Sequence, residues 1–205
     1  MLPAADCKLI QIVDSALADA VQRSGSWLVC RPGCTQCCIG PFPISQLDAL
    51  RLQAGLTELE QTDPSRAERV RQRARKYVAK LAAQFPGNAD TGILEDERQD
   101  DFDTFADDEP CPALDPVTGT CDVYAHRPIT CREFGPPVRI GAEDDDANDV
   151  SAGFSVCELC FQGASPEQVA ACEMISDPDA LESQLIAELE AEGQRGQTIV
   201  AWALR

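Results

Sequence analysis

Residues 30–38 read CRPGCTQCC and place four cysteines within nine positions. These cysteines are Cys30, Cys34, Cys37 and Cys38. Such spacing also occurs on the buried stripe of a helix. Pro32 and Gly33 argue against a helix, because proline in a helix interior costs ~3 kcal/mol and glycine ~1 kcal/mol relative to alanine. The stretch therefore predicts an irregular loop that turns several thiols inward.

Adjacent cysteines limit how this loop can bind a metal. Neighbouring side chains diverge in a helix and alternate in a strand, so Cys37 and Cys38 are not expected to serve one tetrahedral ion together. One of the two would then ligate a second centre, bridge two ions, or ligate nothing.

Further thiols occur in the middle of the chain, in the stretch CPALDPVTGTCDVYAHRPITCREFG. The turn residues at 115–119 predict a hairpin flanked by Cys111 and Cys121. Pro128 suits the first turn of a short helix that carries Cys131. We expect these three thiolates to come together.

A final pair, Cys157 and Cys160, has the spacing of metal ligands in the sequence CELC, although the role of Cys160 stays open. Cys7 and Cys172 fall on predicted helices away from the other cysteines, and both are expected to be structural, buried as small apolar groups.

The cysteine count and the N-terminus favour metal over disulfides. Eleven cysteines cannot all pair within one chain. The N-terminus has no basic leader followed by an apolar segment, so we expect no signal peptide and a reducing cytoplasmic location. Disulfide or thiol-redox chemistry and inert buried thiols are the alternatives.

The composition disfavours two classes of partner. The net charge of −18 repels nucleic acid and anionic membranes. No apolar run is long enough to span a membrane. We therefore expect neither nucleic acid nor membrane as a partner, and favour a protein.

The rest of the chain predicts mainly helices. A helix is expected at 7–22, a short one from the Ser45 and Asp48 capping pair, and a longer one from Asp63-Pro64 to about Phe85. Two more are expected from Ser165-Pro166 and from Asp177-Pro178 to near Gly193. Two acidic segments, 86–110 and 143–149, are expected to be solvated, mobile loops rather than calcium sites, because neither has the calcium-loop pattern. Residues 198–204 are expected to form a short strand or a docked tail. The fold class is mainly α with a small β-hairpin, with helices around an irregular cysteine-rich metal-binding centre. We expect a single domain, 1–205, with its cysteine region at about 27–160 and a helical extension at 161–205.

Polar residues near the cysteines leave alternatives. Arg127 and Arg132 could hydrogen-bond thiolates or form surface ion pairs with the acidic loops. Tyr124 is expected in the core, and His126, the only histidine, on the surface. A basic stripe on the 63–85 helix is interpreted as a solvated face balanced by the protein's own acidic loops rather than as a docking face for an acidic partner. The stripe comprises Arg66, Arg69, Arg73, Lys76 and Lys80.

The run CRPGCTQCC followed by CPALDPVTGTCDVYAHRPITCREF resembles the YkgJ-like cysteine-cluster family of zinc- or iron-chelating proteins, with its CxxxCxxCC signature. The resemblance runs from about Trp27 to Cys160. It implies metal binding by eight candidate ligands: Cys30, Cys34, Cys37, Cys38, Cys111, Cys121, Cys131 and Cys157. A related module in a flagellin lysine methylase implies an iron–sulfur cluster, but no glycine-rich nucleotide fingerprint supports that activity here.

Three functions follow as hypotheses. The first is a cytoplasmic protein with a cysteine-ligated iron–sulfur cluster, [4Fe–4S] being one form, that serves as a redox, electron-transfer or accessory module. The second is a zinc-binding structural or adaptor domain for protein partners. The third is an enzyme that uses the cluster on an unidentified substrate.

Overall fold

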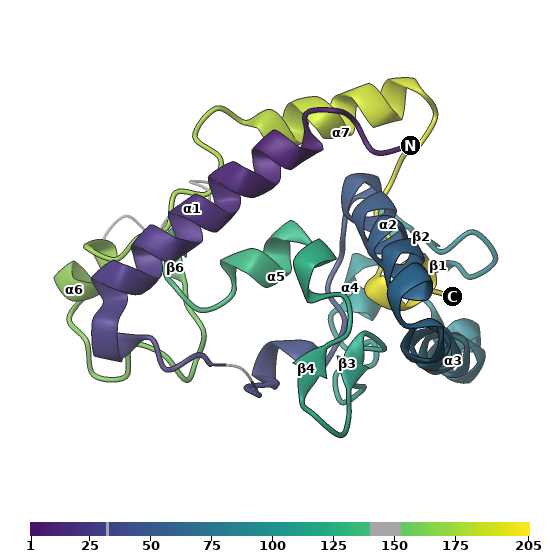
Figure 1. Ribbon diagram of the computed structural model, residues 1–205, viewed down its shortest axis with the longest axis horizontal. Helices are drawn as coiled ribbons and strands as arrows, with labels where there is room; N and C mark the ends of the chain where they lie inside the picture. Colours follow the sequence, from purple (N-terminus) through teal and green to yellow (C-terminus); the bar gives the residue numbers. More distant parts are fainter. Residues whose placement is uncertain (32, 140–152) are drawn as a thin grey trace. The chain divides into compact units, whose positions relative to one another are not determined.

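The computed structural model describes residues 1–31, 33–139 and 153–205. The predicted acidic loop at 143–149 lies outside these residues. Within them the chain is 51% helical, with eight α-helices and small two-stranded hairpins (Figure 1), which confirms the predicted fold class. The helices are α1 Asp6–Ser24, α2 Gln46–Thr62, α3 Pro64–Leu81, α4 Gln99–Phe102, α5 Ile129–Glu133, α6 Pro166–Ala170, α7 Leu181–Ala191 and α8 Val200–Ala203.

Among the described residues the strands are each two residues long, and they form three antiparallel pairs. They are β1 Gly87–Asn88 with β2 Ile93–Leu94, β3 Leu114–Asp115 with β4 Thr120–Cys121, and β5 Val138–Arg139 with β6 Phe154–Ser155. In β3–β4, Leu114 pairs with Cys121 and Asp115 with Thr120. This is the hairpin that the turn residues predicted.

The chain divides into two compact units, each built from segments distant in sequence. Unit 1 comprises Met1–Pro3, Pro32–Pro128 and Gln184–Arg205. Unit 2 comprises Ala4–Arg31 and Ile129–Ser183.

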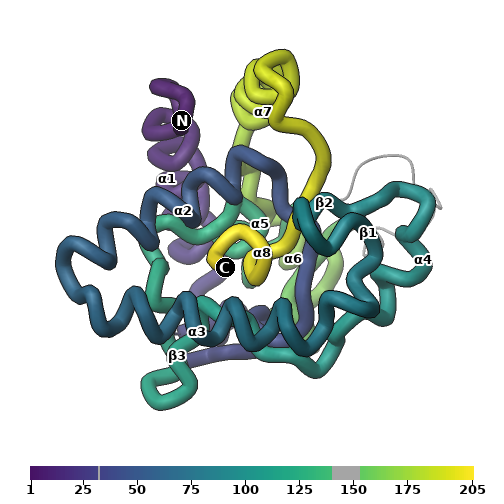
Figure 2. The backbone as a smooth tube through the Cα atoms, turned by 90° about the vertical axis from the view of Figure 1, so that its right-hand side faces the viewer, coloured from purple at the N-terminus to yellow at the C-terminus, as the bar shows by residue number. Residues whose placement is uncertain are grey.

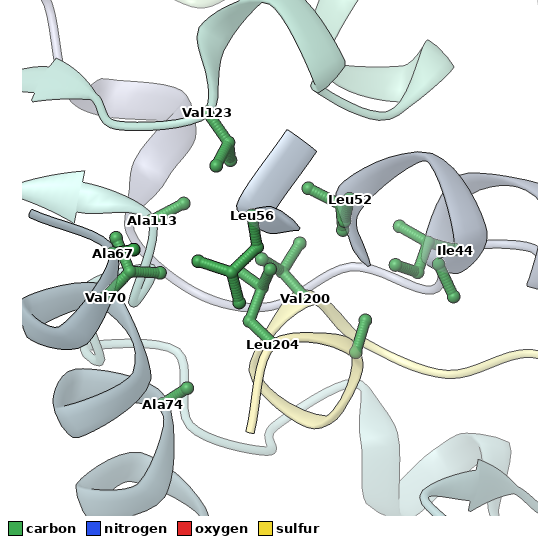
Figure 3. Close-up of a cluster of buried hydrophobic side chains, with 12 residues drawn as sticks. Ile44, Leu52, Leu56, Ala67, Val70, Ala74, Ala113, Val123, Val200 and Leu204 are labelled. Atoms are coloured by element: carbon green, nitrogen blue, oxygen red, sulfur yellow. The ribbon is translucent and has the colours of Figure 1, made fainter. Parts of the chain in front are cut away.

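The core of unit 1 lies where α2, α3 and α8 meet. Figure 2 shows α8, at the C-terminus, beside both longer helices, and both helices contact it. Figure 3 shows Leu56 of α2, Val70 of α3 and Leu204 converging, and each is at most 6% exposed. Cys111 and Cys121 pack against this cluster from the β3–β4 region. The candidate ligands of the hairpin therefore rest on a well-packed base.

Local signals explain where α2 and α3 begin. The Ser45 hydroxyl accepts a hydrogen bond from the Asp48 backbone N–H at 3.1 Å. The Asp63 carboxylate accepts one from the Arg66 N–H at 3.0 Å, and Pro64 occupies the first turn. Both caps confirm the prediction. Helix α2 is longer than expected, and α3 ends at Leu81, before the 3₁₀ turn Ala82–Gln84.

Residues 86–110 are more ordered than the acidic composition predicted. They contain β1, β2, the 3₁₀ turn Asp96–Arg98 and α4. Phe102 and Phe105 are buried in an aromatic cluster with Phe85 and Trp202, whose rings stack with centroids 4.1 Å apart. The prediction of a solvated loop was wrong here, because these phenylalanines contribute apolar area that outweighs the cost of ordering the charged neighbours.

The C-terminal tail packs within unit 1. Of the two predicted alternatives, a strand or a docked tail, the docked tail is therefore confirmed. Ile44 and Thr198 exchange backbone hydrogen bonds of 2.8 and 2.9 Å. Trp202 donates its indole N–H to the Ala89 carbonyl at 2.8 Å. The segment after Thr198 then forms α8 rather than a strand.

Unit 2 contains α1, α5, α6 and the β5–β6 pair, and α1 contacts α5. The side chain of Arg23, near the end of α1, donates to the carbonyls of Ala171 and Glu173 at 2.7 and 2.8 Å. Helix α6 starts with the predicted capping box of Ser165 and Gln168. Farther along the chain, α7 starts at Leu181, slightly later than predicted, and the Asp177 carboxylate accepts its first N–H groups.

Candidate metal centre

The first group of thiols lies in unit 1 and joins the cysteine-rich loop to the β3–β4 hairpin. The Cys111 backbone N–H donates to the Cys38 carbonyl at 2.7 Å. Beside it, Ile39 and Pro110 form an isolated antiparallel bridge. The loop and the middle of the chain, separated by about seventy residues, therefore meet at their cysteines.

The other end of the loop reaches the hairpin turn. Gly119 has a φ of +68°. A Cβ atom built there would lie 3.6 Å from the Gly33 Cα and 3.6 Å from the Thr35 Cγ2. Cys34 stands between these two contacts. The loop therefore contacts the hairpin turn at the residues on both sides of Cys34, and it contacts Cys111, just before the hairpin, at Cys38.

The loop itself is irregular, as Gly33 predicted. Gly33 has a φ of +89°, which excludes it from a right-handed helix. Residues Gln36–Cys38 form one 3₁₀ turn, and the Cys38 N–H donates to the Thr35 carbonyl at 2.9 Å. The Cys37 and Cys38 side chains hydrogen-bond to each other.

Burial, together with a neighbouring thiol in two of the three cases, raises the pKa of three thiols in this group. The hydrogen bond with Cys38, and then burial, raises the pKa of Cys37 well above its ordinary value. Burial raises the pKa of Cys111 to about 12, and the neighbouring Cys121 adds to this rise. Burial also raises the pKa of Cys121. These thiols therefore keep their protons at neutral pH, and a metal that binds them would have to displace those protons.

Backbone N–H groups point at the same sulfurs. The N–H groups of Ala113 and Leu114 donate to the Cys111 sulfur, and that of Val123 donates to the Cys121 sulfur. Such donors lower a thiol's pKa and stabilise its thiolate. They act against the effect of burial, so the hairpin favours thiolates once a cation is present.

Asp122 anchors this hairpin to α3. Its side chain is fully buried and pairs with both Arg66 and Arg73. Arg73 also donates to the Pro112 carbonyl at 2.8 Å. One arginine thus ties together the residues that follow Cys111 and Cys121. Sequence reasoning missed Asp122, although its place directly after a candidate ligand was a usable signal.

The basic stripe of α3 pairs with the protein's own acids. Arg66 and Arg73 contact Asp122, and Lys80 contacts Glu109 in the predicted acidic segment. Among these three side chains, the interpretation as a face balanced by the acidic loops is confirmed for Lys80 alone, because Asp122 directly follows β4 and lies outside both acidic segments. Two of the pairs serve the hairpin, which the prediction did not include.

Arg127 lies near the first group of thiols. Its guanidinium lowers the pKa of Cys37 and of Cys121, although other effects on each thiol are larger. It also stacks 4.0 Å above the ring of Tyr124. Tyr124 is 63% exposed, so its predicted place in the core was wrong; the ring covers a cation instead.

His126 lies at the surface, as predicted, with its side chain 27% exposed. Its Nε2 lies 3.4 Å from a carboxylate oxygen of Glu58. A Cβ atom at Gly55 would lie 2.5 Å from both the Cβ and the Cγ of His126, so α2 needs a glycine there. The histidine therefore packs against α2.

The second group of thiols lies in unit 2. Cys157 and Cys160 are hydrogen-bonded through their side chains, and the N–H groups of Val29 and Cys30 donate to the Cys160 sulfur. Burial, to which Cys157 adds, raises the pKa of Cys160. Cys131 belongs to the same unit, on α5. The backbone donors to Cys160 were not predicted.

Arg132, on α5, is 2% exposed and forms an ion pair with Asp14 of α1. This partner is on a helix and not in the acidic loops. The predicted role of Arg132 next to a thiolate stays a prediction.

The two cysteines expected in helical cores differ. Cys172 is buried at 5% exposure, as predicted. Its predicted place on a helix away from the other cysteines was wrong, because α6 ends at Ala170 and Cys172 packs in one cluster with Cys160. Cys7 lies on α1 as predicted but is exposed, so its predicted burial was wrong. The apolar positions Leu9 and Val13 occupy the buried face of α1 instead.

The donor chemistry fits a thiophilic metal. All eleven cysteines are within the described residues, and each is a thiol. Thiolates suit zinc, iron and iron–sulfur clusters. In the described part of the chain, no three His, Cys, Asp or Glu side chains are already arranged to hold a metal ion. Binding would therefore require side-chain rotation around sulfurs that the backbone already brings together.

A small cleft lies next to Cys111 in unit 1. Tyr77, Glu109, Cys111 and Ile199 line it, and its empty volume is about 280 Å³, part of it open to solvent. Its enclosed volume is only about 20 Å³, far below the roughly 300–1,000 Å³ of a pocket for a drug-sized ligand.

Comparison with known proteins agrees with this chemistry. Residues 29–149 match the model of the family named CxxCxxCC, described as "Putative zinc- or iron-chelating domain". The match covers more than half of the chain, so the protein belongs to this family. It is a metal-binding cysteine-cluster domain for zinc or iron. No curated protein and no solved structure matches the chain. Among the described helices, none has the length and apolar character needed to cross a membrane.

Proposed function

We propose that unit 1 binds an iron–sulfur cluster and that the protein is a redox, electron-transfer or accessory module. The candidate ligands are Cys34, Cys37 or Cys38, Cys111 and Cys121. The observation that supports this most strongly is the hydrogen bond between the Cys111 N–H and the Cys38 carbonyl, which joins the loop to the hairpin. When bound, a cluster supplies an electron-transfer centre whose potential depends on nearby hydrogen bonds and on exposure to solvent.

The residues of unit 1 suit this role in three ways. N–H groups of the hairpin donate to the sulfurs of Cys111 and Cys121. Arg127 places a positive charge near the thiols, which offsets the charge of several thiolates. Cys34, Cys37 and Cys38 are half-buried rather than enclosed, so that a centre there would be near the surface. Exchange of electrons with a protein partner requires such access.

Five cysteines in unit 1 exceed the four that a cluster needs. Adjacent residues diverge, so we assign only one of Cys37 and Cys38 to the cluster. The thiol that remains would donate its S–H to the neighbouring sulfur, as it does in the pair described above. The cytoplasm, where thiols stay reduced, is the compartment that this function requires.

Zinc is the second candidate, and one observation favours it. Cys111 and Cys121 pack directly against the hydrophobic core of unit 1. A zinc ion held by four thiolates is saturated and structural, and it contributes directly to folding. The protein would then act as a structural or adaptor domain for protein partners.

Metal analysis separates the two candidates. The chain is purified without oxygen, and iron, acid-labile sulfide and zinc are measured together with the visible spectrum. An iron–sulfur cluster predicts a brown protein with iron and sulfide in equal amounts. A colourless protein that holds zinc alone would contradict the first proposal and support the second.

A pair of variants tests the ligands. Cys34→Ser should lose metal from unit 1 and lower the stability, because metal binding and folding are coupled. Cys7→Ser is the matched control, since Cys7 is exposed on α1. Equal metal content in the two variants would contradict the assignment of Cys34.

A further inference from the structure

The family match ends at residue 149, whereas two cysteines with ligand spacing follow it. Cys157 and Cys160 sit on one turn, in which the Cys160 N–H donates to the Cys157 carbonyl at 2.8 Å. Their side chains are hydrogen-bonded to each other. The turn therefore presents two sulfurs side by side.

A third cysteine reaches this turn from the start of the chain. The N–H groups of Val29 and Cys30 donate to the Cys160 sulfur, and the Phe161 N–H donates to the Trp27 carbonyl at 2.9 Å. Cys30 is the first cysteine of the CRPGCTQCC run, yet its backbone contacts the CELC turn within unit 2. Backbone donors of this kind stabilise a metal-bound thiolate.

A fourth cysteine lies on the neighbouring helix. A Cβ atom at Gly135 would lie 3.8 Å from the Cβ of Cys30, so the segment after α5 runs next to Cys30. Cys131 precedes Gly135 by four residues, which keeps its Cα within ~14 Å of the Gly135 Cα. All four cysteines belong to unit 2.

We propose that unit 2 has a metal centre of its own, in which a zinc ion is held by Cys30, Cys131, Cys157 and Cys160. Four thiolates satisfy the tetrahedral coordination of zinc. Two of them come from a CxxC turn, which is a common source of ligands in structural zinc sites. The assignment rests on the proposed function in one respect, since it uses only the cysteines that the unit 1 centre leaves over.

The simplest alternative is that these thiols are apolar core groups. Cys160 belongs to a buried cluster with Phe161 and Cys172, and Cys157 packs against it. Cys172 is the matched control, because it is as buried as Cys160, at 5% against 4% exposure. Burial alone therefore predicts the same behaviour for both, whereas a metal centre predicts different behaviour.

The experiment is a cobalt(II) titration of the reduced, metal-free full chain without oxygen. Thiolate-to-cobalt absorption bands count the equivalents bound. We expect Cys160→Ser to lose one equivalent relative to the natural protein, Cys172→Ser to lose none, and Cys111→Ser to keep the equivalent of unit 2. Zinc should compete for the same equivalent and abolish its bands.

Two results would overturn the proposal. One is a Cys160→Ser titration that is the same as that of the natural protein. The other is loss of every equivalent in both Cys160→Ser and Cys111→Ser, which means one shared centre. Cys157→Ser, at a half-buried position, repeats the test if Cys160→Ser does not fold. The proposed function of unit 1 fails separately, if Cys111→Ser leaves the iron and sulfide content unchanged.

Discussion

At the scale of single residues, Asp122 is the most informative side chain outside the cysteines. Its buried carboxylate forms ion pairs with Arg66 and Arg73, whose side chains are 36% and 23% exposed. Asp122 also directly follows Cys121 in the sequence. Removing one partner of such a buried ion pair leaves the other charge uncompensated, which is strongly destabilising. The candidate ligand is thereby fixed to α3.

Asp122→Asn should lower the free energy of unfolding by ~2 kcal/mol, since hydrogen bonds to charged groups contribute ~1.5–3 kcal/mol. It should also weaken metal retention, because the hairpin is released from α3. Urea denaturation and metal analysis measure the two effects. The control is Asp101→Asn, whose pair with Arg98 is exposed and should contribute little. Equal effects from both variants would contradict this role.

The raised thiol pKa of Cys111 predicts how stability depends on pH. An unfolded thiol ionises near 9.0, whereas Cys111 in the fold ionises at about 12. The stabilisation is therefore complete below pH 9 and is lost as the pH rises toward 12, because the unfolded chain then binds fewer protons. Metal-free protein should lose stability over this range, as followed by thermal unfolding.

The matched variant for this pH effect is Cys111→Ser, which lacks the thiol. Its stability should fall less steeply above pH 9 than that of the natural chain. Metal-loaded protein should also show a flatter profile, because its ligands are already deprotonated. Parallel profiles for the natural chain and the variant would rule out this account of Cys111.

Residue roles were the least predictable part of the sequence. Ligand types and their spacing pointed to thiolate chemistry without any structure. Tyr124 was placed in the core although it is exposed, because an aromatic side chain can also cover a cation such as Arg127. Cys7 was placed in the core because cysteine is often buried, but Leu9 and Val13 fill the inner face of α1.

At the scale of elements, the close contact between α2 and the 3₁₀ turn Tyr124–His126 sets the position of the chain after the hairpin. Gly55 allows this contact, since any Cβ there would meet His126 at 2.5 Å. A glycine inside a helix costs ~1 kcal/mol relative to alanine. The helix thus accepts a weaker position in exchange for close packing.

Gly55→Ala should destabilise unit 1, because overpacking costs ~1–3 kcal/mol and exceeds the gain in helix propensity. In a His126→Gly background, which removes both clashing atoms, the same change should become stabilising by up to ~1 kcal/mol. Chemical denaturation of the natural protein, the two single variants and the double variant gives the coupling free energy between positions 55 and 126. The same sign in both backgrounds would be incompatible with the contact.

Elements with strong local signals were predicted well. Ser45, Asp63 and Ser165 cap helices as expected, and the 115–119 turn forms its hairpin. The order of the 86–110 segment was not predicted. It depends on packing of Phe102 and Phe105 against Phe85, which precedes the segment, and against Trp202 of the C-terminal tail. Composition records the acids of such a segment but not the long-range partners of its aromatic residues.

At the scale of the whole molecule, the cysteines fall into two sets that sequence order does not reveal. Cys34, Cys37, Cys38, Cys111 and Cys121 belong to unit 1, whereas Cys30, Cys131, Cys157 and Cys160 belong to unit 2. The CRPGCTQCC run is divided between the units after Arg31. Contacts within each unit, rather than spacing along the chain, group these thiols, so the sequence could propose the ligands but not their grouping.

The most direct test of thiolate metal binding is X-ray absorption at the metal edge of the anaerobically purified full chain. The account predicts a shell of sulfur atoms alone, at about 2.3 Å if the metal is zinc. For an iron–sulfur cluster, it also predicts iron neighbours beyond the sulfur shell. A shell dominated by oxygen or nitrogen atoms would contradict the claim that the cysteines hold the metal.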